Sequence, residues 1–320
     1  EKHAAGVDVR VIYDDVGSLN TLPMNYAHKF EAETGIPCCF FNRFKPIISI
    51  RMNNRDHRKF CIIDGHTAFT GGINLADEYI NQKPRFGHWK DSAILLKGEA
   101  AWSMTVMFLT MWEYIRDVEE DYSRFRPAAL PAEAAGGAGY YVQPYTDNPL
   151  DDEPVGETVY LNLISKAKHY IYAMTPYLII SDSVNTALCN AAKAGVDVRI
   201  ITPHIPDKPL VFELTRSHYE PLLEAGVRIF EYTPGFVHAK NMVVDDLCAV
   251  VGSINLDYRS MFLHFEDAVL LYRDPTILDV KRDFLETQFK SQPVTLEECL
   301  AHAWPRRLFR SILRVLAPLL

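Results

Sequence analysis

The chain contains an internal repeat, and this repeat constrains the fold more than any other feature. The segment Gly6–Ile12 (GVDVRVI) returns as Gly195–Ile201 (GVDVRII). Further blocks return in the same order: a His-x-Lys block at 57–64 and again at 238–245, and a block at 88–93 and again at 264–269. Two copies of roughly 150 residues indicate a duplicated domain rather than a solenoid of many short repeats.

A stretch without hydrophobic periodicity separates the two copies. Residues 126–139 are rich in Pro, Ala and Gly, which is typical of a linker. We place the boundary near residue 135, which gives a first domain at 1–135 and a second at 136–320. Short apolar segments alternate with amphipathic helical ones, which predicts an α/β fold. We expect two similar domains, each a mostly parallel sheet flanked by helices, related by a pseudo-twofold axis with the active site between them.

The first copy begins later in the repeat than the second. About 38 residues separate Glu157 from Gly195, and they hold an expected helix and strand, whereas five residues precede Gly6. The first domain is therefore expected to lack its opening strand and helix, which would leave a sheet edge uncovered. We hypothesise that the sequence is a fragment of a longer protein.

Both copies carry the spacing His-x-Lys-x4-Asp-x6-Gly-[Gly/Ser]-x-Asn. The shorter pattern His-x-Lys-x4-Asp would occur by chance on the order of 0.03 times in such a chain, so two full copies at matching repeat positions indicate function. The motif residues are His57, Lys59, Asp64, Gly71, Gly72 and Asn74 in the first copy, and His238, Lys240, Asp245, Gly252, Ser253 and Asn255 in the second.

The motif supplies the groups that phosphate chemistry requires. On a strand, such as the one expected at 237–244, His and Lys at i and i+2 face the same side. Two copies face to face would bring together two imidazoles, two ammonium groups and the amides of Asn74 and Asn255, with the Ser253 hydroxyl beside them. The cations and donors stabilise the phosphate, while one imidazole attacks phosphorus and the other protonates the leaving oxygen. We interpret Asp64 and Asp245 as residues that fix loop geometry by hydrogen bonds.

Two acidic residues are candidates for orienting the histidines. A nucleophilic His needs its second ring nitrogen held by an acceptor. Glu266 lies beyond the Gly-x-x-Asn turn of the second copy on an expected strand, and Asp91 is its nearest counterpart in the first copy. A solvated acid at a strand edge is the alternative for Asp91. A zinc site is disfavoured, because an ammonium group beside each His repels a cation.

The doubled motif resembles that of the phospholipase D superfamily and, more closely, that of bacterial cardiolipin synthases. The resemblance covers nearly the whole chain and is carried, beyond the motif, by segments such as 6–18, 194–201, 234–240 and 251–260. It implies transfer of a phosphatidyl group between two phosphatidylglycerol molecules through a phosphohistidine, with release of glycerol and with no cofactor or metal. It favours His57 as the nucleophile. It also implies a cell-membrane location, with membrane-spanning helices upstream of this sequence and the catalytic domains on the cytoplasmic side.

Composition separates the remaining alternatives. The sum 33 − 41 gives a net charge of −8, which argues against a phospholipase D-type nuclease or any general nucleic-acid binder. A hydrolytic phospholipase D stays open, since the choice between water and an alcohol depends on water exclusion. The six cysteines form no disulfide-type or zinc-type spacing, which suits a reducing compartment.

The end of the sequence predicts an amphipathic helix. Arg307, Arg310 and Arg314 share one helical face, while Leu308, Ile312, Val315 and Leu319 lie on another. We expect residues 304–320 to lie in the interface of an anionic membrane, with the arginines near the lipid headgroups. The alternative is a helix packed on the protein's own surface.

Overall fold

The computed structural model describes residues 1–43, 50–127, 139–301 and 303–316. The expected boundary near residue 135 lies outside these ranges. The first half contains β1 (Val11–Asp14), α1 (Asp15–Ser18), α2 (Tyr26–Thr34), β2 (Cys38–Phe41), β3 (Arg55–Asp56), β4 (Phe60–Ile63), β5 (Thr67–Gly71), β6 (His88–Lys90), β7 (Ala93–Lys97) and α3 (Glu99–Arg116), together with the 3-10 helices η1 (His3–Ala5), η2 (Ile50–Asn53), η3 (Asp77–Ile80) and η4 (Tyr122–Phe125).

The second half contains most of the regular structure. In chain order its elements are β8 (Tyr141–Asp147), α4 (Val155–Lys166), β9 (Tyr170–Met174), β10 (Leu178–Ile179), α5 (Asp182–Lys193), β11 (Asp197–Pro203), α6 (Pro209–Ser217), α7 (Tyr219–Glu224), β12 (Arg228–Tyr232), β13 (Gly235–Val237), β14 (Asn241–Val244), β15 (Cys248–Gly252), β16 (Leu256–Asp257), α8 (Tyr258–Phe262), β17 (His264–Tyr272), α9 (Thr276–Phe289), β18 (Ser291–Val294), α10 (Leu296–Leu300) and α11 (Trp304–Leu316).

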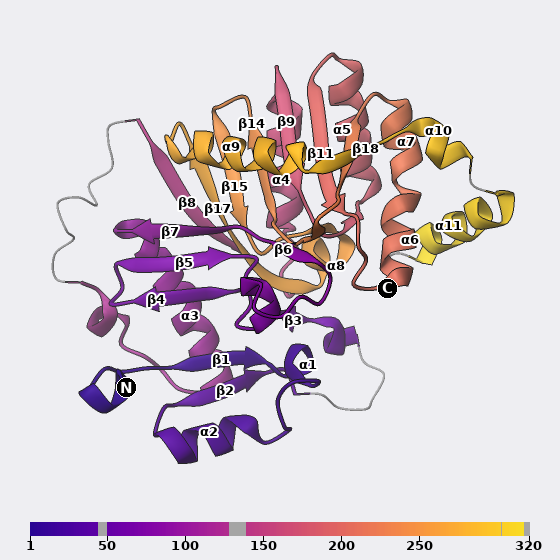
Figure 1. Ribbon diagram of the computed structural model, residues 1–320. Helices are drawn as coiled ribbons and strands as arrows, with labels where there is room; N and C mark the ends of the chain where they lie inside the picture. Colours follow the sequence, from indigo (N-terminus) through magenta and orange to yellow (C-terminus); the bar gives the residue numbers. More distant parts are fainter. Residues whose placement is uncertain (44–49, 128–138, 302, 317–320) are drawn as a thin grey trace.

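The sheet of the second half is mixed. Its strand order is β18-β12-β11-β9-β14-β15-β17-β3, and β8 also pairs with β17. The expected parallel arrangement holds for β9, β11 and β12. It is wrong for β14, β15, β17 and β8, which pair antiparallel. A tight turn between Val244 and Cys248 joins β14 to β15, and such a turn reverses the direction of the chain. The α/β class and the duplication are confirmed, with helices alternating with the parallel strands (Figure 1).

The corresponding sheet of the first half is split in two. Among the described strands β1 pairs only with β2, and β4, β5 and β7 form a separate three-stranded sheet. In the second half β9 joins β11 to β14, whereas no described strand takes the equivalent place between β1 and β4. Figure 1 shows the β1–β2 pair below the three-stranded sheet, as the late start of the first copy predicts.

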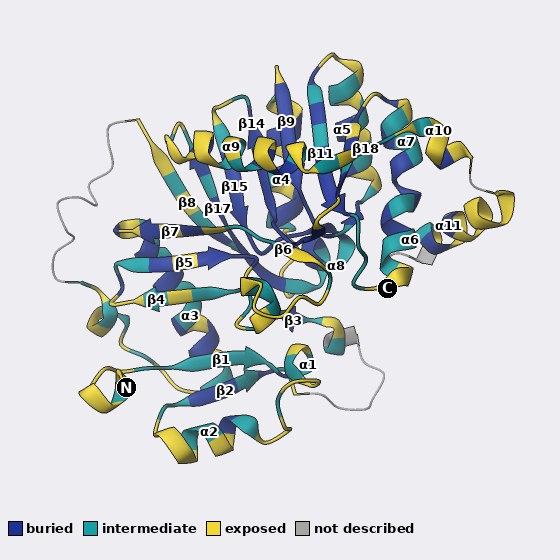
Figure 2. Ribbon diagram, in the orientation of Figure 1, coloured by how far each residue is buried: buried dark blue, intermediate teal, exposed yellow. Residues whose placement is uncertain are grey.

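One hydrophobic cluster joins the halves. Ala68, Leu96 and Met104 of the first half pack in the same cluster as Val243 and Phe284 of the second. Figure 2 shows that the central strands β9, β11, β14 and β15 are buried along most of their length, whereas β4, β5 and β7 each include exposed residues. The two repeats therefore fold against each other rather than as separate bodies.

The C-terminal helix packs on the protein with its charged side. Arg306 and Arg310 form ion pairs with Glu213 on α6, and Arg307 forms one with Glu220 on α7. These ion pairs support the alternative, a helix packed on the protein's own surface, because the three arginines face acidic groups of the chain itself. Residues 317–320, which include Leu319, lie outside the described ranges. Among the described helices, none combines the length and the apolar character needed to cross a bilayer.

Candidate active site

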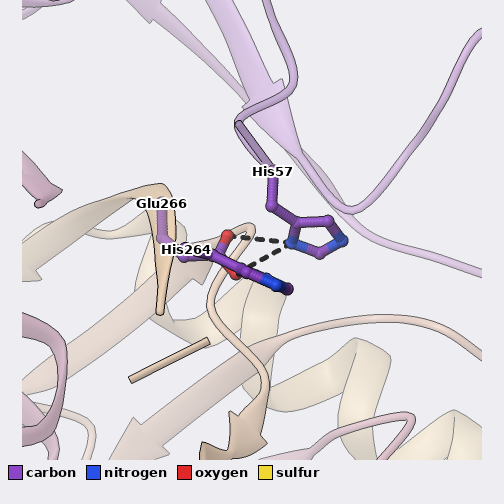
Figure 3. A group of neighbouring side chains, drawn as sticks. All are labelled: His57, His264 and Glu266. Atoms are coloured by element: carbon purple, nitrogen blue, oxygen red, sulfur yellow. Dashed lines mark hydrogen bonds and ion pairs between the residues drawn. The ribbon is translucent and has the colours of Figure 1, made fainter. Parts of the chain in front are cut away.

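The first motif histidine is held by the second half of the chain. His57 follows β3, and its backbone N–H donates to the carbonyl oxygen of Phe265 on β17 at 2.9 Å. Its Nδ1 lies 2.8 and 3.0 Å from the two carboxylate oxygens of Glu266. Figure 3 shows both oxygens facing the His57 ring. Since Glu266 is fully buried, the imidazole is fixed in one orientation by a group of the other repeat.

The second motif histidine is held by the first half. His238 lies between β13 and β14, and its backbone N–H donates to the carbonyl oxygen of Lys90 on β6 at 2.6 Å. Its Nδ1 lies 2.8 Å from a carboxylate oxygen of Asp91. Each repeat therefore supplies the carboxylate that orients the histidine of the other, and β3–β17 and β13–β6 pairing fixes the crossing.

The His-x-Lys segments are not strands, contrary to the expectation for 237–244. The backbone leaves regular structure at His238 and Ala239, because both N–H groups donate to the same carbonyl of Lys90. His and Lys still share one site for another reason. Lys59 Nζ donates to the His57 carbonyl oxygen, and Lys240 Nζ donates to the His238 carbonyl oxygen at 2.5 Å.

Burial and neighbouring cations keep both imidazoles neutral. Burial lowers the pKa of His57 to about 3, against the Glu266 carboxylate, which raises it. Burial and the adjacent Lys240 lower the pKa of His238 to about 4. Burial alone would raise the pKa of Glu266, but His57 and Lys59 hold it well below its usual range. At neutral pH each pair therefore consists of a carboxylate and a neutral ring whose Nδ1 carries the proton.

The two lysines respond to charges from both repeats. Burial, together with Lys59 of the other repeat, lowers the pKa of Lys240 to about 7, while Asp91 opposes the shift. Burial also lowers the pKa of Lys59, against Glu266. Lys240 Nζ lies 2.8 and 3.0 Å from the two ring nitrogens of His238. The cations, histidines and carboxylates of both motifs thus form one electrostatic site.

Ser253 and Gly72 occupy equivalent positions with different surroundings. The Ser253 hydroxyl donates to Glu266 at 2.5 Å and is fully buried, so in this structure it serves the carboxylate rather than a phosphate. A Cβ at Gly72 would lie 2.1 Å from Asp91 Oδ1 and 2.9 Å from the carbonyl oxygen of His238. The shorter Asp91 therefore approaches the backbone at a position that only glycine leaves open.

The motif amides donate within the protein. Asn74 Nδ2 donates to the Tyr79 hydroxyl at 2.6 Å, and Asn255 Nδ2 donates to Asp257 at 2.9 Å. Each amide nitrogen carries a second N–H, so direct donation to a phosphate stays a prediction for Asn74 and Asn255. Tyr79 in turn packs edge-on against the His238 ring, with centroids 5.3 Å apart. The asparagines support the walls of the site.

The motif aspartates differ between the repeats. Asp245 accepts from the backbone N–H groups of Lys168, His169 and Tyr170 at 2.7 to 2.9 Å, and so fixes the start of β9. Asp64 is exposed and has no side-chain hydrogen bond to the described part of the chain. The expected loop-fixing role thus holds for Asp245. It is wrong for Asp64 in this structure, where no described strand takes the equivalent place of β9.

His264 is a site residue that the motif did not indicate. Its Nδ1 lies 3.8 Å from Glu266, and its ring centroid lies 5.6 Å from that of His57. His57, His264 and Glu266 form the only His/Cys/Asp/Glu group in the described residues with spacing that could hold a metal ion. Lys59 acts electrostatically on His57 and Glu266, which disfavours a cation there.

Comparison with known proteins agrees with this geometry. The family described as "Cardiolipin synthase, PLD-like domain" matches residues 1–107 and 160–287. The chain belongs to this family. A cardiolipin synthase of Geobacillus kaustophilus is 37% identical over the whole chain, which spans 63% of that protein. A protein of Streptococcus mutans, named only as uncharacterized, is 47% identical over the whole chain, which spans 68% of it.

A solved structure supports the fold of this family member. The phosphatidylserine synthase of Haemophilus influenzae superposes with a TM-score of 0.70, at 17% identity, covering 97% of this chain and 81% of the other. At this identity the similarity concerns the fold alone. The fold of this chain is thus shared with a protein of low sequence identity.

Strand register corrects the repeat of this cardiolipin synthase-family chain. The sequence repeat aligned 88–93 with 264–269, which would pair Asp91 with Asp267. In the structure Gly71 pairs with Ala93 and Gly252 with Ala268, so Asp91 is equivalent to Glu266. The sequence block is one residue out of register because His88 and His264 match by identity but not by position.

Proposed function

We propose that this chain transfers a phosphatidyl group from one phosphatidylglycerol to a second, giving cardiolipin and glycerol. The observation that carries the proposal is the crossed arrangement of His57 with Glu266 and of His238 with Asp91. It supplies two oriented imidazoles, one from each repeat, beside two lysines. Two such rings suit a two-step exchange, which needs a nucleophile and a separate acid–base group.

In the first step His57 acts as the nucleophile. Its Nδ1 is occupied by Glu266, so Nε2 holds the free lone pair, and the side chain keeps 27% of its surface exposed against 8% for His238. Nε2 attacks the phosphorus, and the bond from phosphorus to the glycerol oxygen breaks. His238 gives its proton to that oxygen, and glycerol leaves. The product of this step is a phosphatidyl group bonded to His57.

In the second step the roles of His238 reverse. The glycerol hydroxyl of a second phosphatidylglycerol gives its proton to His238 and attacks the phosphorus. The bond between phosphorus and His57 breaks, which restores the free ring and releases cardiolipin. Atoms and charge balance over the two steps, and the only by-product is glycerol.

The charged groups of the site match the changes in the substrate. A phosphate anion beside His238 favours its protonated form, which raises its pKa from about 4 toward the range in which it can act as an acid. Lys59 and Lys240 would neutralise the non-bridging oxygens as negative charge develops on them. Because these cations already supply the positive charge, we expect no requirement for a metal or another cofactor.

We also place the protein at the cell membrane, with this part of the chain on the cytoplasmic side and with membrane-spanning helices upstream of this sequence. The phospholipid substrate supports a membrane location. All six cysteines are free, including the adjacent and buried Cys38 and Cys39, which supports a reducing compartment. Cysteine labelling in intact cells with an impermeant reagent tests the orientation, and the exposed Cys61 should stay unlabelled until the cells are opened.

The decisive assay supplies phosphatidylglycerol vesicles as the only substrate, with and without EDTA. The proposal expects cardiolipin and glycerol in equal amounts, with the same rate in chelator. Phosphatidic acid with glycerol would indicate a hydrolytic phospholipase D instead. Loss of activity in EDTA that a divalent ion restores would contradict the metal-independent mechanism.

A further inference from the structure

The helix α11 turns its charged side toward the protein. Arg310 is buried and donates to Glu213 on α6 at 2.8 Å, and Arg306 donates to the same carboxylate. Arg307 donates to Glu220 on α7 at 2.7 Å. The arginines that would normally face solvent on an amphipathic helix therefore anchor this helix to the second half.

The opposite side of α11 is apolar and uncovered. The exposed residues follow helical spacing and share one side of the helix. Among the apolar side chains of α11 that the structure describes, only Leu313 is buried, against Leu214 and Ile179. We call this set the apolar face: Trp304 (73% exposed), Leu308 (51%), Phe309 (45%), Ile312 (52%) and Val315 (79%). A surface helix usually buries its apolar side and exposes its charged side, so this arrangement is inverted and needs a covering partner.

Charge favours an anionic partner for this face. Four arginines of α11 stand against two glutamates, Glu213 and Glu220, so the helix keeps an excess of positive charge. The remaining residue, Arg314, lies half-buried at the edge of the arginine side. An apolar face bordered by excess cations matches the boundary between acyl chains and anionic headgroups. Trp304 at the start of the helix is a residue type typical of that boundary.

Two packed elements, α6 and the β10–β16 strand pair, lie between α11 and the second motif. α11 packs on α6, and α6 packs on β10. β10 pairs with β16, which directly follows Asn255 of the second motif. A surface that holds α11 would therefore lie against the same half of the molecule that carries His238. Figure 1 shows α11 alongside the lower end of α6.

We propose that the apolar face of α11 inserts into the headgroup–acyl boundary of an anionic bilayer and holds the second half of the chain against its lipid substrate. The choice of a bilayer as the partner rests on the proposed function. The proposal differs from the expectation from sequence in its driving force. Burial of apolar side chains supplies most of the binding, while the arginines are occupied by Glu213 and Glu220.

The first test compares two pairs of substitutions by vesicle flotation, using the whole chain in a His57→Ala background so that no turnover occurs. Leu308→Gln with Ile312→Gln should lower binding to vesicles of phosphatidylglycerol and phosphatidylcholine by about 10-fold or more, at low and at high salt. The control is Leu278→Gln with Leu285→Gln on α9, two leucines of similar exposure, which should leave binding unchanged. Equal loss in both pairs, or binding that only salt abolishes, would overturn the proposal.

The second test places the helix directly. Trp304 is far more exposed than Trp89 and Trp112. Lipids brominated on the acyl chains should quench its fluorescence when vesicles are added, and Trp304→Phe should remove this quenching. A bound protein without quenching would contradict insertion. A change in oligomeric state with the Leu308/Ile312 variant, without loss of vesicle binding, would assign the face to a second copy instead.

Vesicle binding and Trp304 quenching report on the docking surface, whereas cardiolipin formation reports on the proposed function. If the parent chain binds through Trp304 but forms no cardiolipin, the proposed function fails and the docking surface stands. If the Leu308→Gln and Ile312→Gln substitutions, made with His57 intact, leave both the rate of cardiolipin formation and vesicle binding unchanged, the docking surface fails and the proposed function stands.

Discussion

The two halves of the molecule carry the same motif but support it by different means. In the second half β9 joins β11 to β14 in one continuous sheet, and His238 and Lys240 are buried. In the first half the equivalent sheet is split, and His57 and Lys59 are only half-buried. His57 is nevertheless fixed, because its backbone and its ring both bond to β17. The comparison teaches that the other repeat, rather than the local sheet, positions each histidine.

The carboxylates that orient the two histidines also differ between the halves in length and in surroundings. The longer Glu266 is held by the hydroxyl of Ser253, and the shorter Asp91 lies against the bare backbone of Gly72. Each carboxylate accepts from a ring Nδ1 at 2.8 Å. Side-chain length and the residue at the glycine/serine position therefore compensate for each other. We expect both halves to be required for turnover, with different roles in it.

The largest effect is expected from the histidines. His57→Ala and His238→Ala should each lower turnover by about 10³-fold or more, because one removes the nucleophile and the other the acid–base group. The double variant should be no slower than the worse single variant, since the two act as a unit. Rates of cardiolipin formation measure this. A single variant with a tenth of the parent rate would show that one half suffices.

The Gly72 position should respond more strongly than its serine counterpart. Gly72→Ala forces a Cβ against Asp91 and the His238 carbonyl, and a displacement on the order of 1 Å costs about 10²-fold in rate. Ser253→Ala introduces no clash and removes the hydroxyl that donates to Glu266 and accepts from the Asp267 backbone N–H, for which we expect about 10-fold. Gly17→Ala is the control, since its Cβ would meet no atom closer than 3.4 Å. Equal effects at Gly72 and Ser253 would refute the compensation.

The lysine of the second half should set the alkaline limit of activity. Lys240 carries its positive charge below its pKa of about 7 and loses it as the pH rises through that value. The kcat/KM should therefore fall more steeply above about pH 7 than below it, while the nucleophile His57 stays neutral throughout this range. A pH profile that stays level to about pH 9 would contradict the lowered pKa.

The smallest effect concerns stability and compares the motif aspartates. Both Asp64 and Asp245 have positive φ values, 52° and 54°, so glycine relieves the backbone equally at both. Asp245→Gly should lower the free energy of unfolding by about 1–2 kcal/mol, because three backbone N–H groups lose their acceptor. The loss is limited to this size because Asp245 is partly exposed and water can replace part of the lost bonding. Asp64→Gly should change it by less than about 0.5 kcal/mol. Denaturant unfolding of the two variants measures the difference, and equal destabilisation would contradict the asymmetry.

Sequence reasoning predicted the repeat, the α/β class and the two His-x-Lys pairs that the structure brings together, because motif spacing and identity carry that information directly. Glu266 and Asp91 were found because a His ring needs an acceptor. Three features were out of reach. The crossing of His57 to Glu266 depends on β3–β17 pairing between segments more than 200 residues apart. The orientation of α11 depends on Glu213, which no local pattern connects to Arg310. His264 joins the site only through the fold.

The central claim is that the halves build one site in which His57 carries the phosphatidyl group. The direct measurement uses a phosphatidyl substrate with a good leaving group, such as nitrophenol, followed by an alkaline quench, digestion and mass spectrometry of the peptides. The account predicts a phosphatidyl adduct on the peptide that contains His57. The adduct should accumulate in His238→Ala, where departure needs no acid but transfer to the acceptor lacks its base, and it should be absent from His57→Ala. An adduct on His238, or turnover without any adduct, would contradict the account.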